Sequence, residues 1–261
     1  MPRPEEVMFP SRKERFEDRR KEDEHRKLRD EFFDHRTLLT ISRLIGQELF
    51  RTLDYPIATG KEGGVFRATA ADGYRAVKVY RVGNTVFRNL PPHVIEVFRR
   101  QASERNFSQL IAAWTRREHT LLGRLTDDGV RVPRPFGHRE NVLVMEFIGD
   151  ANGLPAPRLQ DAPSADAGVF YGLLVDSVRR MVAESKLVHG DLSPYNVLNH
   201  AEVPVLIDVA QSIPSDHPQA RALLERDLRN FAKYFRRLDV EVEFSEIWEA
   251  SGGALLRAGS A

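Results

Sequence analysis

The sequence predicts an α+β fold of two lobes with a cleft between them. Segments with the apolar patterns of strands gather in the first 150 residues, and helical periodicity dominates the second half. The 261 residues are 41% hydrophobic and 30% charged, enough for one large domain or two lobes with a real core. We therefore expect a strand-rich first lobe and a mostly helical second lobe.

The first lobe is expected to follow a charged arm. Residues 1–33 interleave charges of both signs, which predicts a solvated segment or a contact arm for a charged partner. Residues 55–80 show strand patterns on both sides of the turn signal Ala-Asp-Gly at 71–73, which predicts a β-hairpin. Between them an amphipathic helix is predicted by apolar residues at helical spacing, namely Leu38, Ile41, Leu44, Ile45 and Leu49.

The remaining segments alternate between helices, loops and apolar runs. Residues 83–110 are mixed and are expected to include a loop. Helices are predicted for residues 111–125, 171–185 and 220–238, a buried strand for 141–149, a loop for 151–168, and an apolar run at 204–213. We expect an arm (1–33), an extension helix with the first lobe (34–148), the second lobe (149–250) and a tail (251–261).

Composition narrows the class of protein without naming a partner. The 39 basic and 38 acidic residues nearly cancel, so there is no global attraction to nucleic acid or membrane. The absence of cysteine excludes disulfides and thiolate metal sites. No run of about 18 apolar residues exists, and the N-terminus lacks the apolar region of a signal peptide. We expect a cytoplasmic protein with no membrane span.

Two features of the first lobe suit phosphate binding. The stretch ATGKEGGV at 58–65 is a Gly-rich turn, where backbone N–H groups can approach phosphate, although an ordinary hairpin turn would look the same. In the strand AVKV, Lys78 should lie opposite Val77 and Val79, as would also hold for a surface lysine. Glu118, in a predicted helix, is a candidate ion-pair partner that would aim Lys78 at phosphates, or else one more solvated glutamate.

The most specific pattern lies in the second lobe. The stretch VHGDLSPYNVL at 188–198 contains His189, Asp191 and Asn196, and Asp208 follows 12 residues after Asn196. Phosphoryl transfer needs one carboxylate to orient the attacking hydroxyl, and an amide and a second carboxylate to hold Mg²⁺. These residues stand in the order and spacing of a protein-kinase catalytic centre. We expect His189 to brace the loop rather than to act as a base.

Together the motifs resemble those of the RIO-type atypical serine/threonine protein kinases, type-one subfamily. Their short form here is typical of archaeal members. The resemblance covers about residues 38 to 235, and the matching stretches are ATGKEGGVF, AVKVYR, WTRREHTLLGRL, VRVPRP, NVLVMEFIG, the G-x-P-A-P-R-L-x-D at 153–161, LVHGDLSPYNVL, LIDVAQS and DHPQARALLERD. It implies a protein-kinase-like fold, with a twisted antiparallel sheet plus helix in the first lobe, a reduced helical second lobe, and ATP in the cleft.

The resemblance also implies roles for single residues. Thr59 and Lys61 would contact nucleotide phosphates. Lys78 would pair with Glu118 and reach the α- and β-phosphates. In the strand that follows, Met145 would be the gatekeeper-like residue, and Glu146 and Ile148 would present backbone groups to adenine. Asp191 would be the catalytic aspartate, and Asn196 and Asp208 would hold the metal, with Asp208 able to take the phosphate during an ATPase cycle.

The resemblance further implies ATP and Mg²⁺ as cofactors, with Mn²⁺ as an alternative metal, and a maturing small ribosomal subunit and its RNA as partner. A monomer is favoured. Six arginines are candidate RNA contacts, although they would equally suit solvated helix faces: Arg88, Arg99, Arg100, Arg105, Arg116 and Arg117. Ser103 and Ser108 are candidate autophosphorylation sites.

The chain departs from ordinary protein kinases at several points. Gly190 replaces the Arg of H-R-D, and Asp208-Val209-Ala210 replaces D-F-G, both of which suit the RIO type. Gly63 and Gly64 stand where the family usually has Ala-Asn, so we expect a more mobile turn.

Two alternatives stay open. A small-molecule kinase of the aminoglycoside or choline phosphotransferase type also carries H-G-D-x-x-x-x-N, but usually needs a larger helical lobe than the roughly 50 residues after Asp208. A non-catalytic kinase-like scaffold that binds ATP would look the same in sequence.

Overall fold

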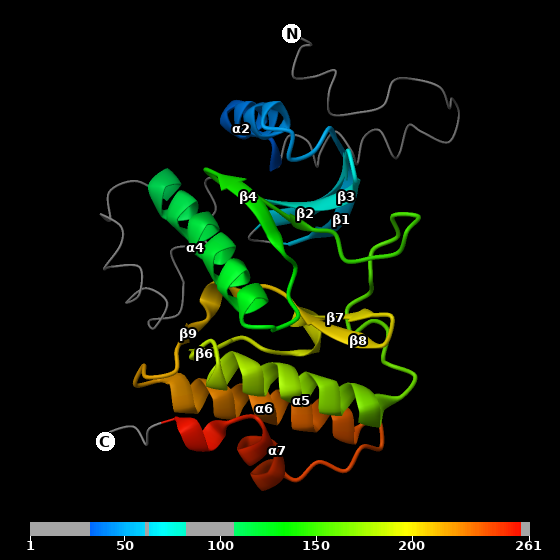
Figure 1. The fold of residues 1–261 in the computed structure, drawn as a ribbon, viewed down its shortest axis with the longest axis vertical. Coiled ribbons are helices and arrows are strands. Elements are labelled where there is room, and N and C mark those ends of the chain that lie inside the picture. The colour runs from blue at the N-terminus through cyan, green and yellow to red at the C-terminus, as the bar shows by residue number, and fades with distance from the viewer. Residues whose placement is uncertain (1–31, 61–62, 82–106, 257–261) are drawn as a thin grey trace. The chain divides into compact units, whose positions relative to one another are not determined.

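A computed structural model of the chain describes residues 32–60, 63–81 and 107–256 (Figure 1). The chain divides into two compact units. Of the described residues, the first unit contains 32–60, 63–81, 107–119 and 135–147, and the second contains 120–134 and 148–256. The first is built on a sheet and the second mainly on helices, which confirms the predicted α+β class.

The first unit is built on a five-stranded sheet in which every neighbouring pair is antiparallel. Its order is β1-β2-β3-β5-β4. The predicted hairpin is present, because β2 and β3 pair in full register from Gly63↔Tyr80 to Ala70↔Gly73. The strands are β1 (Thr52–Thr59), β2 (Gly63–Ala70), β3 (Gly73–Tyr80), β4 (Pro135–Arg139) and β5 (Val142–Glu146).

The core of the first unit lies on one face of this sheet. Alternation along β2 buries Phe66 and Ala68 while Arg67 stays half-buried, as the two-residue period of a strand requires. Val77 and Val79 of β3 join the same core, so Lys78 lies on the opposite face, as predicted.

Helix α2 (His35–Gly46) packs on this core. Asp34 caps it by accepting a hydrogen bond from the Thr37 N–H at 2.8 Å. Of the predicted apolar positions, Ile41 and Leu44 are buried, but Leu49 lies beyond the end of the helix. The helix stops at Gly46, a poor helix former, and Glu48 then takes a left-handed conformation with φ 62°.

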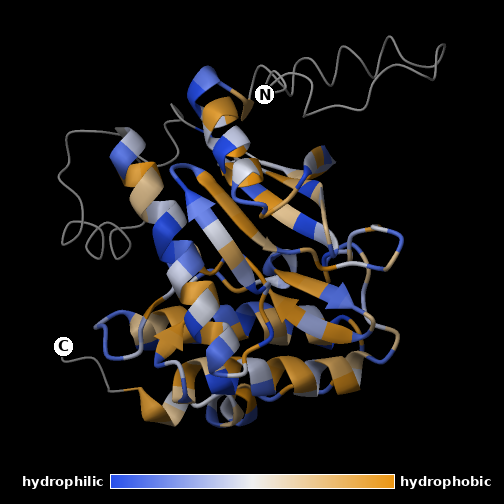
Figure 2. Cartoon of the chain, turned by 45° about the horizontal axis from the view of Figure 1, so that its top comes forward, coloured by the Kyte–Doolittle hydropathy of each residue, from blue (hydrophilic) through white to orange (hydrophobic). Residues whose placement is uncertain are grey.

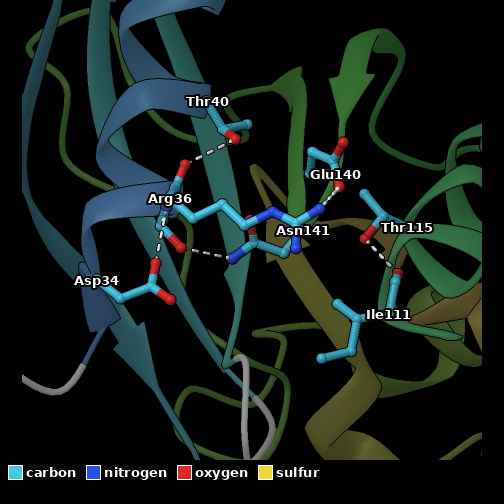
Figure 3. A network of polar contacts seen from close by, with 8 residues as sticks. Asp34, Arg36, Thr40, Ile111, Thr115, Glu140 and Asn141 are labelled. Carbon is cyan, nitrogen blue, oxygen red and sulfur yellow. Dashed lines mark hydrogen bonds and ion pairs between the residues drawn. The ribbon is translucent and has the colours of Figure 1, made fainter. Parts of the chain in front are cut away.

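Polar contacts also fix α2 to the turn between β4 and β5. Figure 3 shows Arg36 reaching Glu140, with 3.1 Å between the guanidinium and carboxylate groups. Beside this pair, the Asn141 side-chain amide donates to the Thr37 hydroxyl at 2.9 Å. Asn141 is only 4% exposed, so this hydrogen bond lies in the interior of the first unit.

Helix α4 (Phe107–Asp127) contributes its first thirteen residues to the first unit, 107–119. It confirms the helix predicted for 111–125 and begins four residues earlier. The buried positions Ile111, Trp114, Thr115 and Glu118 form one helical stripe. Figure 3 shows the Thr115 hydroxyl donating to the carbonyl of Ile111 one turn earlier, at 2.9 Å. Glu118 therefore occupies a core position of this helix.

The second unit contains the helices predicted for 171–185 and 220–238, together with two small antiparallel sheets. Hydrophilic and hydrophobic residues alternate along its helices in Figure 2, as amphipathic helices require. The pairs β6-β9 and β7-β8 form the sheets. The elements are α5 (Ala167–Ala183), β6 (Leu187–Val188), η2 (Pro194–Asn196), β7 (Val197–His200), β8 (Val203–Leu206), η3 (Val209–Gln211), β9 (Ile213–Pro214), α6 (Ala220–Arg236), α7 (Phe244–Ala250) and η4 (Gly253–Leu255).

The apolar run at 204–213 is not one strand. Strand β8 ends at Leu206, and Asp208 turns the chain with φ 60° and ψ 46° before η3 and β9. Helix α7 has no counterpart in the sequence-based expectation. Among the described helices, none combines the length and the apolar character needed to cross a membrane.

Candidate active site

Lys78 and Glu118 form an ion pair inside the first unit. The Lys78 ammonium lies 2.7 Å from Glu118 Oε1. The side chains are only 13% and 2% exposed, so the pair is largely shielded from water. A buried carboxylate is stable only when its charge is matched by close donors. The structure thus contains the predicted pair, and Glu118 is not on a solvated helix face.

A third residue, Tyr80, belongs to this pair and was not predicted from the sequence. Its hydroxyl donates a hydrogen bond to Glu118 Oε2, and its ring centroid lies 5.0 Å from the Lys78 ammonium. Burial, followed by the negative charge of Glu118, raises the pKa of Tyr80 well above its ordinary value, so the hydroxyl keeps its proton. The sequence could have indicated this contact, because Tyr80 lies two residues after Lys78 in the same strand, and residues two apart in a strand share a face.

The face of the sheet that carries Lys78 also carries Met145, the predicted gatekeeper-like residue. Lys78 pairs in register with Val65 of β2 and Leu143 of β5, and Ala76 pairs with Met145. Because directly paired residues share a face, these five side chains project to one side of the sheet. On such a face, an ammonium group can bind the phosphates of a nucleotide, and small and apolar side chains can contact its base.

The predicted adenine contacts lie at and after the end of β5. Glu146 is the last residue of that strand. Ile148 belongs to the second unit, where its carbonyl accepts the Ala156 N–H at 2.9 Å. The Ile148 N–H makes no hydrogen bond among the described residues.

The Gly-rich turn is partly described. Thr59 is exposed at the end of β1 and pairs with Gly64, while Lys61 lies outside the described residues. Gly63 is part of β2, and a Cβ there would come within 2.4 Å of the Val79 carbonyl oxygen. A Cβ on Gly64 would meet the Phe32 and Phe66 rings at 3.0 Å. A side chain at either position would crowd neighbouring atoms, so packing favours glycine there in addition to the mobility expected of the turn.

The second unit holds the loop from His189 to Asn196. The Asn196 amide donates to the Asp191 carbonyl at 2.7 Å and to Asp191 Oδ2 at 3.3 Å. Its Oδ1 carries no hydrogen bond in the described part of the chain and is available as a ligand. Asp191 is exposed and Asn196 half-buried, so both can meet a substrate.

Asp208 is joined to this loop through its neighbour Ile207. The Ile207 N–H donates to the Asn196 carbonyl at 3.0 Å, and its carbonyl lies 3.0 Å from His189 Nε2. Burial lowers the pKa of His189, although the charges of Asp191 and Asp208 oppose this effect, so we expect a neutral ring. His189 therefore ties the two segments together, in agreement with the bracing role expected of it.

Asp227 of α6 supports the same loop and was also missed in the sequence. Asp227 Oδ2 accepts the Gly190 N–H at 2.9 Å, and Arg226 donates to the Gly190 carbonyl. Burial raises the pKa of Asp227 to about 7, against the lowering effects of Arg226 and of the Gly190 and Leu192 N–H groups. The signal was its place on the apolar face of the helix, which comprises Leu223, Leu224, Leu228 and Phe231.

The donor set of the second unit fits Mg²⁺. The side chains of Asn196 and Asp208 offer hard oxygen atoms, and Asn196 Oδ1 has no competing hydrogen bond in the described chain. No group of three His, Cys, Asp or Glu residues suited to a metal occurs among the described residues. Mg²⁺ is usually held by one or two protein carboxylates and completes its shell with phosphates and water.

Other predicted residues are described only in part. Ser103 and Arg88, Arg99, Arg100 and Arg105 lie outside the described residues. Ser108 lies in the first turn of α4. Arg116 is exposed, and Arg117 is half-buried with a pKa lowered by burial.

An antiparallel sheet with a buried Lys–Glu pair, and a loop unit with Asp, Asn and Asp at kinase spacing, define the protein-kinase-like class. Residues 64–247 match the RIO domain. The chain is 37% identical over 238 residues to the RIO-type serine/threonine-protein kinase Rio1 of Methanocaldococcus jannaschii, covering 91% of this chain and 81% of the relative. The chain belongs to the RIO family, as the sequence motifs predicted.

Further relatives and a solved structure agree. Rio1 of Haloferax volcanii is 34% identical, covering 90% of this chain and 80% of its own. RIO1 of Caenorhabditis elegans is 37% identical, covering 82% of this chain, which spans only 43% of that longer protein. The crystal structure of the Rio2 kinase from Chaetomium thermophilum shares the fold, with a TM-score of 0.64, 21% identity and coverage of 82% and 67%. The predicted kinase-like fold is thereby confirmed.

Proposed function

We propose that this chain is an ATP-dependent serine/threonine protein kinase of the RIO type, with an accompanying ATPase activity. The observation that carries the proposal is the buried Lys78–Glu118 pair, because an ammonium fixed in this way on an apolar sheet face suits nucleotide phosphates. The named activity of the relatives supports it. We also propose that the chain passes from the first lobe to the second near residue 148, where the second unit resumes with Ile148.

In the proposed reaction, each described residue has one task. Lys78 binds the α- and β-phosphates, and the backbone groups of Glu146 and Ile148 bind adenine. Asp191 accepts the proton of the acceptor hydroxyl as its oxygen bonds to the γ-phosphorus and the bond to the leaving ADP oxygen breaks. Asn196 and Asp208 would hold Mg²⁺, or Mn²⁺ in its place, and such an ion would supply neutralisation of the charge on the phosphates.

We further propose that Asp208 itself can accept the phosphoryl group in the ATPase cycle. The Rio2 kinase of Chaetomium thermophilum has been solved as an ADP/Mg²⁺-phosphoaspartate complex, at 18% identity and a TM-score of 0.62 to this chain. Asp208 is suited to such a role because its left-handed backbone sets it apart from β8 at a turn. The phosphoaspartate would then be hydrolysed to regenerate the carboxylate.

The proposed setting is the cytoplasm, where a monomeric chain acts on a maturing small ribosomal subunit. The exposed side chain of Arg116 is a candidate contact to ribosomal RNA. Affinity for that RNA should then fall with rising salt, because neutralised phosphates release counterions. An affinity for the RNA that does not change between about 50 and 200 mM salt would contradict the proposed contact.

The function is tested by ATP hydrolysis and by phosphoryl transfer to small ribosomal subunits, measured beside the Asp191→Ala and Asp208→Ala variants. We expect turnover that rises with subunits and is lost in Asp208→Ala. Unchanged turnover in Asp191→Ala would overturn its catalytic assignment and favour an ATP-binding scaffold. Turnover that ignores subunits but rises with aminoglycosides or choline would favour a small-molecule kinase instead.

A further inference from the structure

The Glu118 carboxylate is held at both of its oxygens. Lys78 binds Oε1 at 2.7 Å, and the Tyr80 hydroxyl binds Oε2. No other donor reaches this carboxylate among the described residues. A carboxylate with a single donor can rotate about its last bond, whereas one with two donors on different oxygens keeps its plane. The direction of the Lys78 ammonium depends on that plane.

Tyr80 itself is fixed from the backbone side by Asn141. The Tyr80 N–H donates to the Asn141 carbonyl at 2.9 Å, and the Asn141 amide donates to the Tyr80 carbonyl at 2.8 Å. The same amide donates to Thr37 of α2, beside the Arg36–Glu140 pair drawn in Figure 3. Tyr80 is 1% exposed. Its hydroxyl therefore has little freedom to leave Glu118.

We propose that Tyr80 is a positioning residue for phosphate binding: its hydroxyl fixes the Glu118 carboxylate, which in turn aims Lys78 at the phosphates of ATP. This inference rests on the proposed function. Tyr80 does not touch the nucleotide in this scheme, and it acts only through Glu118 and Lys78. The hydrogen bonds from Thr37 through Asn141 to Tyr80 extend the same support to helix α2.

The test separates phosphate binding from base binding. Dissociation constants for ATP with Mg²⁺ and for adenosine are measured by calorimetry on the full chain and on Tyr80→Phe, which removes one buried oxygen. Because Lys78 meets only phosphates, we expect about tenfold weaker ATP binding, near 1.4 kcal/mol, and adenosine binding within about twofold of the parent. A merely structural role would weaken both ligands alike.

Tyr74→Phe is the matched control. Tyr74 lies in the same strand, its ring packs on Phe147 and under the Arg67 guanidinium, and its hydroxyl makes no hydrogen bond among the described residues. We expect both dissociation constants to stay unchanged in Tyr74→Phe. Equal losses in the two tyrosine variants would overturn the proposal, because the effect would then not depend on Glu118.

Two further variants complete the design. Lys78→Met removes the ammonium, and the double variant with Tyr80→Phe should bind ATP no more weakly than Lys78→Met alone. Additive losses would show that Tyr80 acts by another route and would overturn the inference. If Tyr80→Phe does not fold, Glu118→Gln tests the same link. Its amide has one acceptor oxygen where the carboxylate has two, so either Lys78 or Tyr80 loses its partner in place, and the same split between ATP and adenosine is expected.

The proposed function has its own failure. If the parent protein binds no ATP, or if Lys78→Met binds it as well as the parent does, the nucleotide site itself is wrong. If Lys78→Met weakens ATP binding but Tyr80→Phe and Glu118→Gln leave it unchanged, the site stands and the positioning role of Tyr80 is rejected.

Discussion

The Gly190 N–H donates a hydrogen bond of 2.9 Å to Asp227 Oδ2, across 37 residues of sequence. Gly190 lies in the loop of the candidate catalytic aspartate, and Asp227 lies on the buried face of α6. Because Asp227 is only 1% exposed, the loop is anchored to the interior of the second unit. The position of Asp191, the next residue after Gly190, therefore depends on the core and not only on its own turn.

The raised pKa of Asp227 should make stability depend on pH. Its pKa is about 7 in the folded chain against an ordinary value of 3.8, so the folded state binds more protons between these values. Protonated Asp227 therefore adds to the free energy of unfolding. This stabilisation is complete below pH 4 and is lost as the pH rises to about 7, and the total loss is at most about 4 kcal/mol. Urea unfolding of the parent and of Asp227→Asn across this range measures it.

In Asp227→Asn the dependence should be smaller, since an amide does not titrate and its oxygen can still accept the Gly190 N–H. Asp216→Asn, an exposed site without such burial, is the control and should follow the parent curve. Parallel curves for the parent and Asp227→Asn would show that Asp227 does not titrate in this range.

Gly63 should tolerate no side chain. In Gly63→Ala the new Cβ would lie 2.4 Å from the Val79 carbonyl oxygen, so the β2–β3 pairing must shift. We expect a loss of about 1 to 3 kcal/mol in the free energy of unfolding. Gly46→Ala is the control, because nothing lies within 4 Å of its Cβ and alanine favours helix, with a gain of up to about 1 kcal/mol expected. Denaturant melts that rank the two variants in the opposite order would contradict the described register.

Asn141 should matter for stability in proportion to its two side-chain hydrogen bonds. Asn141→Ala removes the bonds to Thr37 and to the Tyr80 carbonyl at a site that is 4% exposed, so about 2 to 3 kcal/mol should be lost. Thr37→Val removes only the first bond and should lose about 1 kcal/mol. In the double variant the two losses should not add, since the Thr37–Asn141 bond is counted twice. Strict additivity in urea melts would argue against that bond.

The candidate site was predictable to the extent that local patterns decide it. Strand alternation placed Lys78 opposite Val77 and Val79, and the spacing of Asp191 and Asn196 identified the loop. The partners of these residues come from distant segments. Asp227 could be seen only as an acid on an apolar helix face, and its target Gly190 needs the packed structure.

The fold shows the same limit. Strand β1 was not predicted, because its exposure does not alternate and its pairing with β2 shifts register around Pro56. The short strands β6 and β9 have two residues each and carry no periodic signal. The need for glycine at position 63 arises from the opposite strand, so no local rule could give it.

Asn196 should have two separable roles in the proposed reaction. Its Oδ1 is available to a metal ion, while its amide nitrogen donates to the carbonyl and carboxylate of Asp191. In Asn196→Ala both are lost, so we expect turnover to fall by about 10²-fold and the half-saturating Mg²⁺ concentration to rise about tenfold or more. ATP hydrolysis measured as a function of Mg²⁺ concentration gives both quantities.

Asn196→Asp separates the two roles. A carboxylate supplies the metal ligand but cannot donate to Asp191, and it places a like charge beside the carboxylate of Asp191. We expect a half-saturating Mg²⁺ concentration close to that of the parent, with turnover still reduced about 10²-fold. Recovery of turnover together with Mg²⁺ binding would show that Asn196 serves only the metal, and that Asp191 is oriented without its amide.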